Sequence, residues 1–265
     1  MPKSSRLICD KADRINSRNK SQYFEKTKVL WMPVSIGQDY HELDGLLKSI
    51  KLIRKNLTHI TLIKVIIVDL AQRYHLAIKN NTSPQKMLYE SKKRGLSWRE
   101  SYEHLIRNCF KNITVEFNTW DEWLNHENYN QSRQQIDILY NEKTNFKKHL
   151  ENDVLEFERR YFNRESRYLT TIEKEYCREC IKEECATLIL WSRSFVSVGH
   201  AYIFYPKKIP EAMSFIKQNF TNFFFIFAQF STSKRNSYLF FKSDKTNLIK
   251  QEASAFTIKH RRFSI

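Results

Sequence analysis

The chain has 265 residues, with 45 Lys and Arg against 29 Asp and Glu, so its formal net charge is +16. A basic excess of this size favours a polyanionic partner such as nucleic acid. The five cysteines are irregularly spaced, which does not indicate an extracellular disulfide framework. No apolar segment of a secretory signal follows the basic first residues, and the apolar run at 220–230 is too short to cross a bilayer. We therefore expect a cytoplasmic protein that contacts no membrane.

Residues 1–25 are polar and basic with little periodicity, which is typical of a flexible N-terminal arm. The rest of the chain, 26–265, has no glycine-, proline- or serine-rich linker, and the whole chain contains only 4 Gly and 5 Pro. We therefore expect one domain after the arm.

Residues 29–34 are apolar on both faces, as in a strand covered by helices on both sides, and Gly37 permits a tight turn after it. Residues 39–53 show the apolar spacing of a helix, and the β-branched run 62–69 predicts a second strand. Strand, helix and strand indicate a parallel pair joined by a right-handed crossover. Ser35 then stands at the carboxyl end of a strand, where open α/β sheets bind their ligands.

Between residues 83 and 110 the sequence indicates two helices, separated by a stop at Gly95. They carry the densest basic stretch outside the termini. A solvated surface explains these charges equally well, but we expect them to contact the phosphates of a nucleic acid: Lys86, Lys92, Lys93, Arg94, Arg99 and Arg107.

Further along, the patterns predict strands at 112–117, 202–205, 223–230 and 238–241 and helices at 129–163, 169–191 and 210–218. Alternating strands and helices are typical of an α/β protein. We expect a single Rossmann-like domain whose mostly parallel sheet is flanked by helices.

Three short segments carry residues suited to chemistry: 33–38, 181–186 and Tyr205-Pro206. Taken alone, Ser35 does not identify a nucleophile, because the Gly-x-Ser-x-Gly elbow of hydrolases is absent and a serine at a strand end is usually a turn residue. In order and separation, however, the three segments together resemble the signature segments of the tRNA-dependent cyclodipeptide synthases. Gln38, three positions after the serine, and the Tyr205-Pro206 dipeptide resemble the branch of that family called XYP.

The resemblance implies a fold similar to the catalytic domains of class I tyrosyl- and tryptophanyl-tRNA synthetases, with no ATP, no other cofactor and no metal. It implies that Ser35 takes an aminoacyl group from one tRNA, that a second aminoacyl-tRNA gives a dipeptidyl-enzyme, and that ring closure releases a diketopiperazine. By the same resemblance, Glu184 holds the substrate's α-ammonium group and Tyr205 hydrogen-bonds the ester or assists proton movement. We expect a monomer with two aminoacyl-tRNAs as its substrates.

One position departs from the family pattern. Four residues before Glu184 the family has a tyrosine, and this chain has Cys180. Either Cys180 or Tyr176, one turn earlier, stands in for it, or the register is shifted and Glu183 or Glu179 is the true partner.

Strand side chains alternate, so Trp31 and Pro33 share a face with Ser35, and Val65 and Ile67 share one face of the next strand. Because a tryptophan narrows a pocket, we expect a small or medium first amino acid. The residues that we expect to contact the substrate are Trp31, Pro33, Gly37, Gln38, Val65, Ile67, Tyr176, Cys180, Glu183 and Pro206.

Other interpretations stay open. His41, beside the turn, could be a general base or an ordinary surface histidine, and Cys177-x-x-Cys180 lacks the second ligand pair of a zinc finger. A catalytically silent, synthetase-like tRNA-binding protein is a second possible function. A third is another aminoacyl-tRNA-dependent acyltransferase that releases a linear product.

Overall fold

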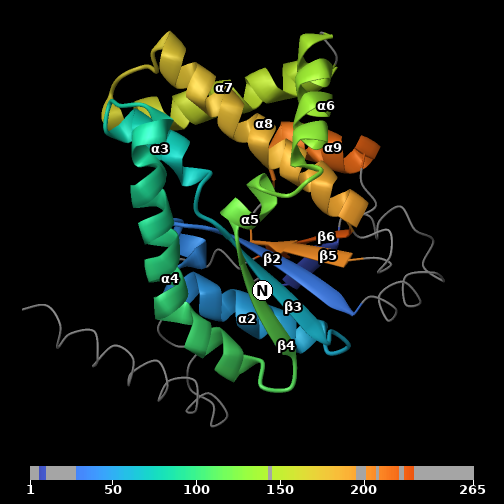
Figure 1. Ribbon diagram of the computed structural model, residues 1–265. Helices are drawn as coiled ribbons and strands as arrows, with labels where there is room; N and C mark the ends of the chain where they lie inside the picture. The colour runs from blue at the N-terminus through green and yellow to red at the C-terminus, as the bar shows by residue number, and fades with distance from the viewer. Residues whose placement is uncertain are drawn as a thin grey trace, which may run out of the picture.

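A six-stranded sheet lies at the centre of the molecule (Figure 1). The computed structural model describes residues 6–9, 28–142, 145–194, 201–206, 209–220 and 224–229. The strands are β1 (Arg6–Cys9), β2 (Val29–Ser35), β3 (Leu62–Val68), β4 (Thr114–Thr119), β5 (Ala201–Tyr205) and β6 (Phe224–Gln229). Their spatial order is β1-β6-β5-β2-β3-β4.

All neighbouring strands from β6 to β4 run parallel, and only β1 pairs antiparallel, with β6. The first parallel strand, β2, lies in the middle. The chain adds β3 and β4 on one side of it and then β5 and β6 on the other. The boundary between β2 and β5 is therefore the topological switch point, where ligands bind in sheets of this kind. The predicted Rossmann-like α/β fold is confirmed.

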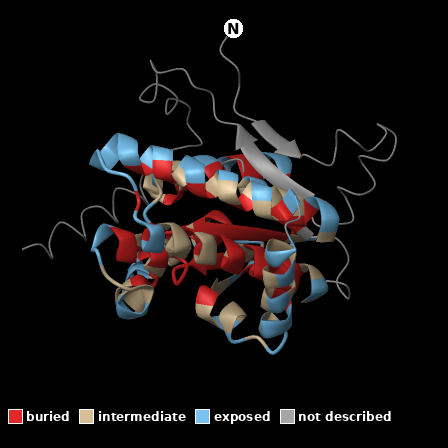
Figure 2. Ribbon diagram, turned by 90° about the horizontal axis from the view of Figure 1, so that it is seen from above, coloured by how far each residue is buried: buried red, intermediate tan, exposed pale blue. Residues whose placement is uncertain are grey.

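Helices cover both faces of the sheet. The helices are η1 (Asp39–His41), α2 (Leu43–Asn56), α3 (Gln72–Lys79), η2 (Pro84–Met87), α4 (Leu88–Cys109), α5 (Trp120–Leu124), α6 (Tyr129–Asn141), α7 (Asn145–Glu165), α8 (Thr171–Ser194) and α9 (Glu211–Phe220). Helices α2 and α4 pack on one face, and α3 and α5 to α9 pack on the other (Figure 1). Viewed from above, buried residues concentrate in the strands and along the inner sides of the helices (Figure 2).

The pairing of β2 with β3 corrects one expectation about the sheet. Ser35 pairs with Val68 and Trp31 pairs with Lys64, so even-numbered residues of β3 share the face of Ser35. Val65 and Ile67 belong to the opposite core, under α2 and α4. Placing these two residues beside Ser35 is therefore wrong, because alternation within each strand does not reveal how two strands are paired.

Helix α4 runs unbroken through Gly95, where the sequence predicted a stop. A Cβ atom at this position would lie 2.5 Å from the Cβ of Asp69, so the glycine allows a close approach of α4 to the end of β3. Asp69 is 3% exposed and accepts hydrogen bonds from the backbone N–H groups of Leu70 and Trp120. Gly95 thus serves packing around a buried aspartate and does not end the helix.

Two further expectations change. The segment Arg6–Cys9, inside the predicted flexible arm, forms the antiparallel strand β1, so the arm prediction is wrong for these four residues. The single helix expected at 129–163 is two helices, α6 and α7. The predicted strand at 238–241 lies outside the described residues. Among the described helices, none combines the length and apolar character needed to cross a membrane.

Candidate active site

The turn that follows β2 holds Ser35 by its backbone. The Ser35 N–H donates to Nδ1 of His41 over 3.0 Å, and the carbonyl of His41 accepts from the indole N–H of Trp98 over 3.0 Å. Gly37 has φ of +77°, in the region that favours glycine. His41 is 2% exposed, so it is a buried anchor of the turn and not a surface histidine. The contacts described for its Nδ1 are with the backbone N–H and C=O groups of Ser35.

Three hydroxyl groups form a chain at the switch point. The Ser35 Oγ lies 3.1 Å from the Tyr205 hydroxyl oxygen, and the Tyr40 hydroxyl oxygen lies 3.0 Å from the same Tyr205 atom. Ser35 ends β2, Tyr205 ends the neighbouring strand β5, and Tyr40 lies on η1. All three side chains are partly exposed. The structure thus brings together Ser35 and Tyr205, which lie far apart in the sequence, and adds Tyr40, which the sequence did not single out.

The Glu184 carboxyl acts electrostatically on the two phenols of this hydroxyl chain. Burial raises the pKa of Glu184 on α8 to about 7, and the nearby carboxylates of Glu183 and Asp153 add to this effect. Burial also raises the pKa of Tyr205 and of Tyr40, and the charge of Glu184 raises both further. The charge of Glu184 thus acts on both phenols, and its side chain is partly exposed.

Glu183, the residue before Glu184, makes its polar contacts with other side chains inside the protein. It is 3% exposed and forms an ion pair with Arg73. It also accepts a hydrogen bond from the indole N–H of Trp120 over 2.9 Å. Glu184, in contrast, forms no ion pair with another residue in the described ranges. Of the two carboxylates, only Glu184 is therefore available for a substrate's ammonium group.

Comparisons with solved structures decide the fold family. No protein-family model matches the chain, and no curated protein matches it significantly. A cyclodipeptide synthase from Fluoribacter dumoffii matches it with a TM-score of 0.69 at 19% identity, over 85% of this chain and 98% of that chain. The protein has the cyclodipeptide synthase fold.

Two more structures show the same cyclodipeptide synthase fold. The enzyme from Candidatus Glomeribacter gigasporarum, bound to Phe-tRNAPhe, matches with a TM-score of 0.60 at 17% identity, over 83% of this chain and 95% of that chain. A Mycobacterium tuberculosis protein matches with a TM-score of 0.59 at 12% identity, over 86% of this chain and 94% of that chain. Its structure is described as demonstrating that cyclodipeptide synthetases are related to type I tRNA synthetases.

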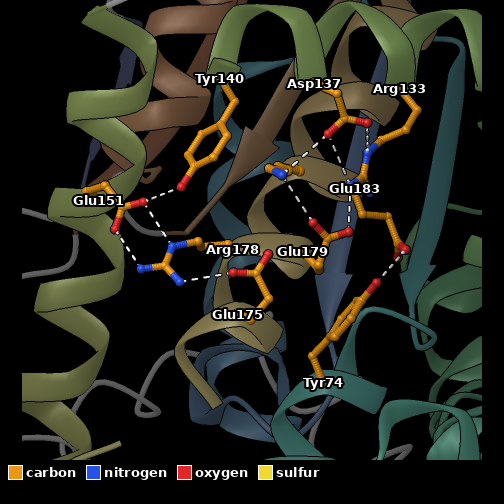
Figure 3. Close-up of polar contacts among 10 residues, drawn as sticks. Tyr74, Arg133, Asp137, Tyr140, Glu151, Glu175, Arg178, Glu179 and Glu183 are labelled. Atoms are coloured by element: carbon orange, nitrogen blue, oxygen red, sulfur yellow. Dashed lines mark hydrogen bonds and ion pairs between the residues drawn. The ribbon is translucent and has the colours of Figure 1, made fainter. Parts of the chain in front are cut away.

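Within this cyclodipeptide synthase fold, a network of charges sets the rotation of α8 (Figure 3). Glu179 accepts from Arg133 over 2.5 Å and from Lys182 over 3.2 Å, and Arg178 donates to Glu151 over 2.9 Å. Other members are Asp137, Tyr140 and Glu175. Ion pairs that remain partly in contact with water, as these do, contribute up to about 1 kcal/mol each. Together they join α6, α7 and α8: Glu179 pairs with Arg133 of α6, and Arg178 pairs with Glu151 of α7.

The two proposed substitutes for the family's tyrosine make no described hydrogen bond to the hydroxyl chain. Cys180 is 4% exposed, and its thiol donates to the Ala71 carbonyl over 3.6 Å. Burial raises the pKa of this thiol. Tyr176 packs against the core. The hydrogen bonds described for Ser35 and Tyr205 involve neither residue, and no group of at least three metal-ligating side chains occurs among the described residues.

The expected pocket residues fall into two groups. Trp31 is 1% exposed and packs against the rings of Trp123 and Trp191, whose centroids are 5.3 and 5.2 Å away. It therefore does not line an accessible pocket in this structure, and the argument from Trp31 to a small or medium substrate loses its basis. Pro33 and Pro206 are also buried, whereas Gly37 is exposed and Gln38 is partly exposed in the turn beside Ser35.

The six basic residues expected to contact nucleic acid lie on η2 and α4. Four of them are paired with acidic side chains: Lys92 with Asp121, Arg94 with Glu90, and Arg99 and Arg107 with Glu103. Lys86 and Lys93 are exposed and form no ion pair with any other described residue. Of the six, these two offer the most readily available positive charges.

Proposed function

We propose that the protein belongs to the XYP-type cyclodipeptide synthases and joins two amino acids delivered by aminoacyl-tRNAs. The observation that carries the proposal is the position of the Ser35 hydroxyl, 3.1 Å from the Tyr205 hydroxyl at the carboxyl ends of β2 and β5. This is the ligand-binding point of such sheets. The likeness to cyclodipeptide synthase structures covers almost all of their length, and Gln38 with Tyr205-Pro206 supports the branch.

In the first step, the Ser35 Oγ attacks the ester carbonyl carbon of an aminoacyl-tRNA. A bond forms between Oγ and that carbon, the bond from the carbon to the tRNA 3′-oxygen breaks, and the 3′-oxygen takes up a proton as Ser35 loses one. Tyr205, in contact with Ser35, is placed to pass this proton. Because one ester replaces another, the step needs no ATP.

The next two steps use the amino group of the bound amino acid. The amine of aminoacyl-Ser35 attacks the ester carbonyl of the second aminoacyl-tRNA, which forms a dipeptidyl-enzyme and releases the second tRNA. The new terminal amine then attacks the Ser35 ester, closes the diketopiperazine ring and restores the serine. Glu184 binds the α-ammonium group before each attack. With a pKa raised to about 7, it is also able to accept the proton that the ammonium must lose.

The test is intact-mass analysis after incubation with charged tRNAs and without ATP. We expect an aminoacyl adduct on Ser35 and a diketopiperazine in solution. The Ser35→Ala variant should form neither. Ser101→Ala, which removes a hydroxyl from α4, is the matched control and should behave like the unmodified protein.

The products of the same incubation distinguish the proposed function from the two alternative functions. A linear dipeptide would identify a different acyltransferase. Binding of tRNA without any adduct or product would identify a silent tRNA-binding protein, and a diketopiperazine formed by Ser35→Ala would remove the serine from the mechanism.

A further inference from the structure

Tyr40 is the one member of the hydroxyl chain for which the proposed reaction has no role. It lies on η1, five residues after Ser35, and its hydroxyl oxygen is 3.0 Å from that of Tyr205. Its ring lies against the ring of His41, with a centroid distance of 4.6 Å, and against the edge of Tyr205. The turn that fixes the backbone of Ser35 therefore also carries a group that contacts Tyr205.

The number of hydrogens limits how these three groups can bond. Each hydroxyl has one hydrogen to donate and two lone pairs to accept with. Tyr205 is in contact with both Ser35 and Tyr40. If Ser35 and Tyr40 both donate to the Tyr205 oxygen, the Tyr205 hydrogen remains free to point toward a substrate. If Tyr205 donates to either neighbour, that hydrogen is no longer available.

We propose that Tyr40 is a positioning residue for acyl transfer: its hydroxyl donates to the Tyr205 oxygen and so directs the Tyr205 hydrogen toward the departing tRNA oxygen. The inference rests on the proposed function of Ser35. As Oγ bonds to the ester carbon and the carbon–oxygen bond to tRNA breaks, the Ser35 proton moves to Tyr205 and the Tyr205 proton moves to the tRNA 3′-oxygen. Tyr40 keeps its own proton and does not touch the substrate.

The directions of the pKa shifts of Tyr205 and Tyr40 are consistent with a hydrogen bond donated by Tyr40 to Tyr205. Burial raises the pKa of Tyr205, while the hydrogen bonds from Ser35 and Tyr40 lower it. A donor to the Tyr205 oxygen stabilises the charge that develops as its proton leaves, so each such bond makes Tyr205 a better acid. The pKa of Tyr40 is raised by burial and by Tyr205, which is consistent with a phenol that keeps its proton.

The first test is the Tyr40→Phe variant, which removes the hydroxyl and keeps the ring that packs on His41. In single-turnover experiments with excess protein and one charged tRNA, we expect Ser35 to be acylated roughly 10- to 100-fold more slowly, as for loss of an oriented hydrogen bond in proton transfer. The affinity for tRNA should not change. Tyr168→Phe is the matched control, because it removes a phenolic hydroxyl from a side chain that is 68% exposed and plays no part in the site described above.

The second test asks whether Tyr40 acts through Tyr205. If it does, the double variant Tyr40→Phe with Tyr205→Phe should be acylated as slowly as Tyr205→Phe alone, because removing Tyr205 already removes the effect of Tyr40. A purely structural role for Tyr40 would make the two losses multiply, which would overturn the inference. Acylation of Tyr40→Phe within about twofold of the unmodified rate would overturn it as well.

The same experiment distinguishes this inference from the proposed function. If the unmodified protein forms no adduct on Ser35, the function itself is wrong and the role of Tyr40 is rejected with it. If the unmodified protein and Tyr40→Phe form the adduct equally fast, only the role of Tyr40 is rejected.

Discussion

Replacement of Glu184 by glutamine should stabilise the protein at alkaline pH. Its carboxyl has a pKa of about 7 in the folded chain, against an ordinary value of 4.5, chiefly because of burial. Between these two pH values the folded state keeps a proton that the unfolded state releases. The free energy of unfolding therefore falls as pH rises from 4.5 to 7, and the full penalty is present above pH 7.

The size of the effect follows from the displacement of the pKa. At about 1.4 kcal/mol per pH unit, a change from 4.5 to about 7 corresponds to at most about 4 kcal/mol. Water at this partly exposed group reduces that figure, and we expect roughly 1–3 kcal/mol. Glutamine carries no charge at any pH, so Glu184→Gln removes the penalty and should also weaken binding of the substrate's ammonium group.

The measurement is urea unfolding of the unmodified protein and Glu184→Gln at several pH values from 5 to 8. The stability of Glu184→Gln relative to the unmodified protein should increase from pH 5 to about pH 7 and then level off. Glu100→Gln, which changes an exposed carboxylate on α4, controls for loss of one negative charge. If the difference between Glu184→Gln and the unmodified protein does not vary with pH, the pKa of Glu184 is not raised and the reasoning fails.

Three further predictions concern the scaffold and the partner. Arg73→Leu leaves the Glu183 carboxylate buried without its cation, so we expect a loss of about 3–5 kcal/mol in urea unfolding, largely recovered when Glu183→Leu is added. Gly95→Ala places a methyl group against Asp69 and should lower stability by about 1–3 kcal/mol; a melting temperature equal to that of the unmodified protein would contradict the close approach. Lys93→Ala should weaken tRNA binding and reduce the slope of log affinity against log salt by about 1, whereas an unchanged slope would exclude a phosphate contact.

The convergence of Ser35 and Tyr205 could be anticipated from the sequence because it depends on a general property of sheets. Each residue ends an apolar run, and parallel strands place such ends at one edge. The order of the strands is what makes them neighbours, and a resemblance to a family supplied that order in advance.

The sequence predictions were wrong or incomplete where a residue's position depends on contacts with distant parts of the chain, which local sequence patterns do not reveal. Val65 and Ile67 alternate as expected within β3, but the pairing of β3 with β2 decides which face meets Ser35. Tyr40 was missed because its contact with Tyr205 depends on a short 3-10 turn. Gly95 was interpreted as a helix stop, since nothing near it in the sequence indicates that Asp69 packs against that position.

Strand β1 has a practical consequence for work with shortened versions of the protein. It pairs antiparallel with β6, whose sequence, Phe-Phe-Ile-Phe-Ala-Gln, is almost entirely apolar. Removal of the first nine residues to trim a seemingly dispensable terminus would expose the backbone N–H and C=O groups along β6. An uncovered apolar strand of this kind recruits other chains, so such truncated proteins should aggregate in proportion to their concentration.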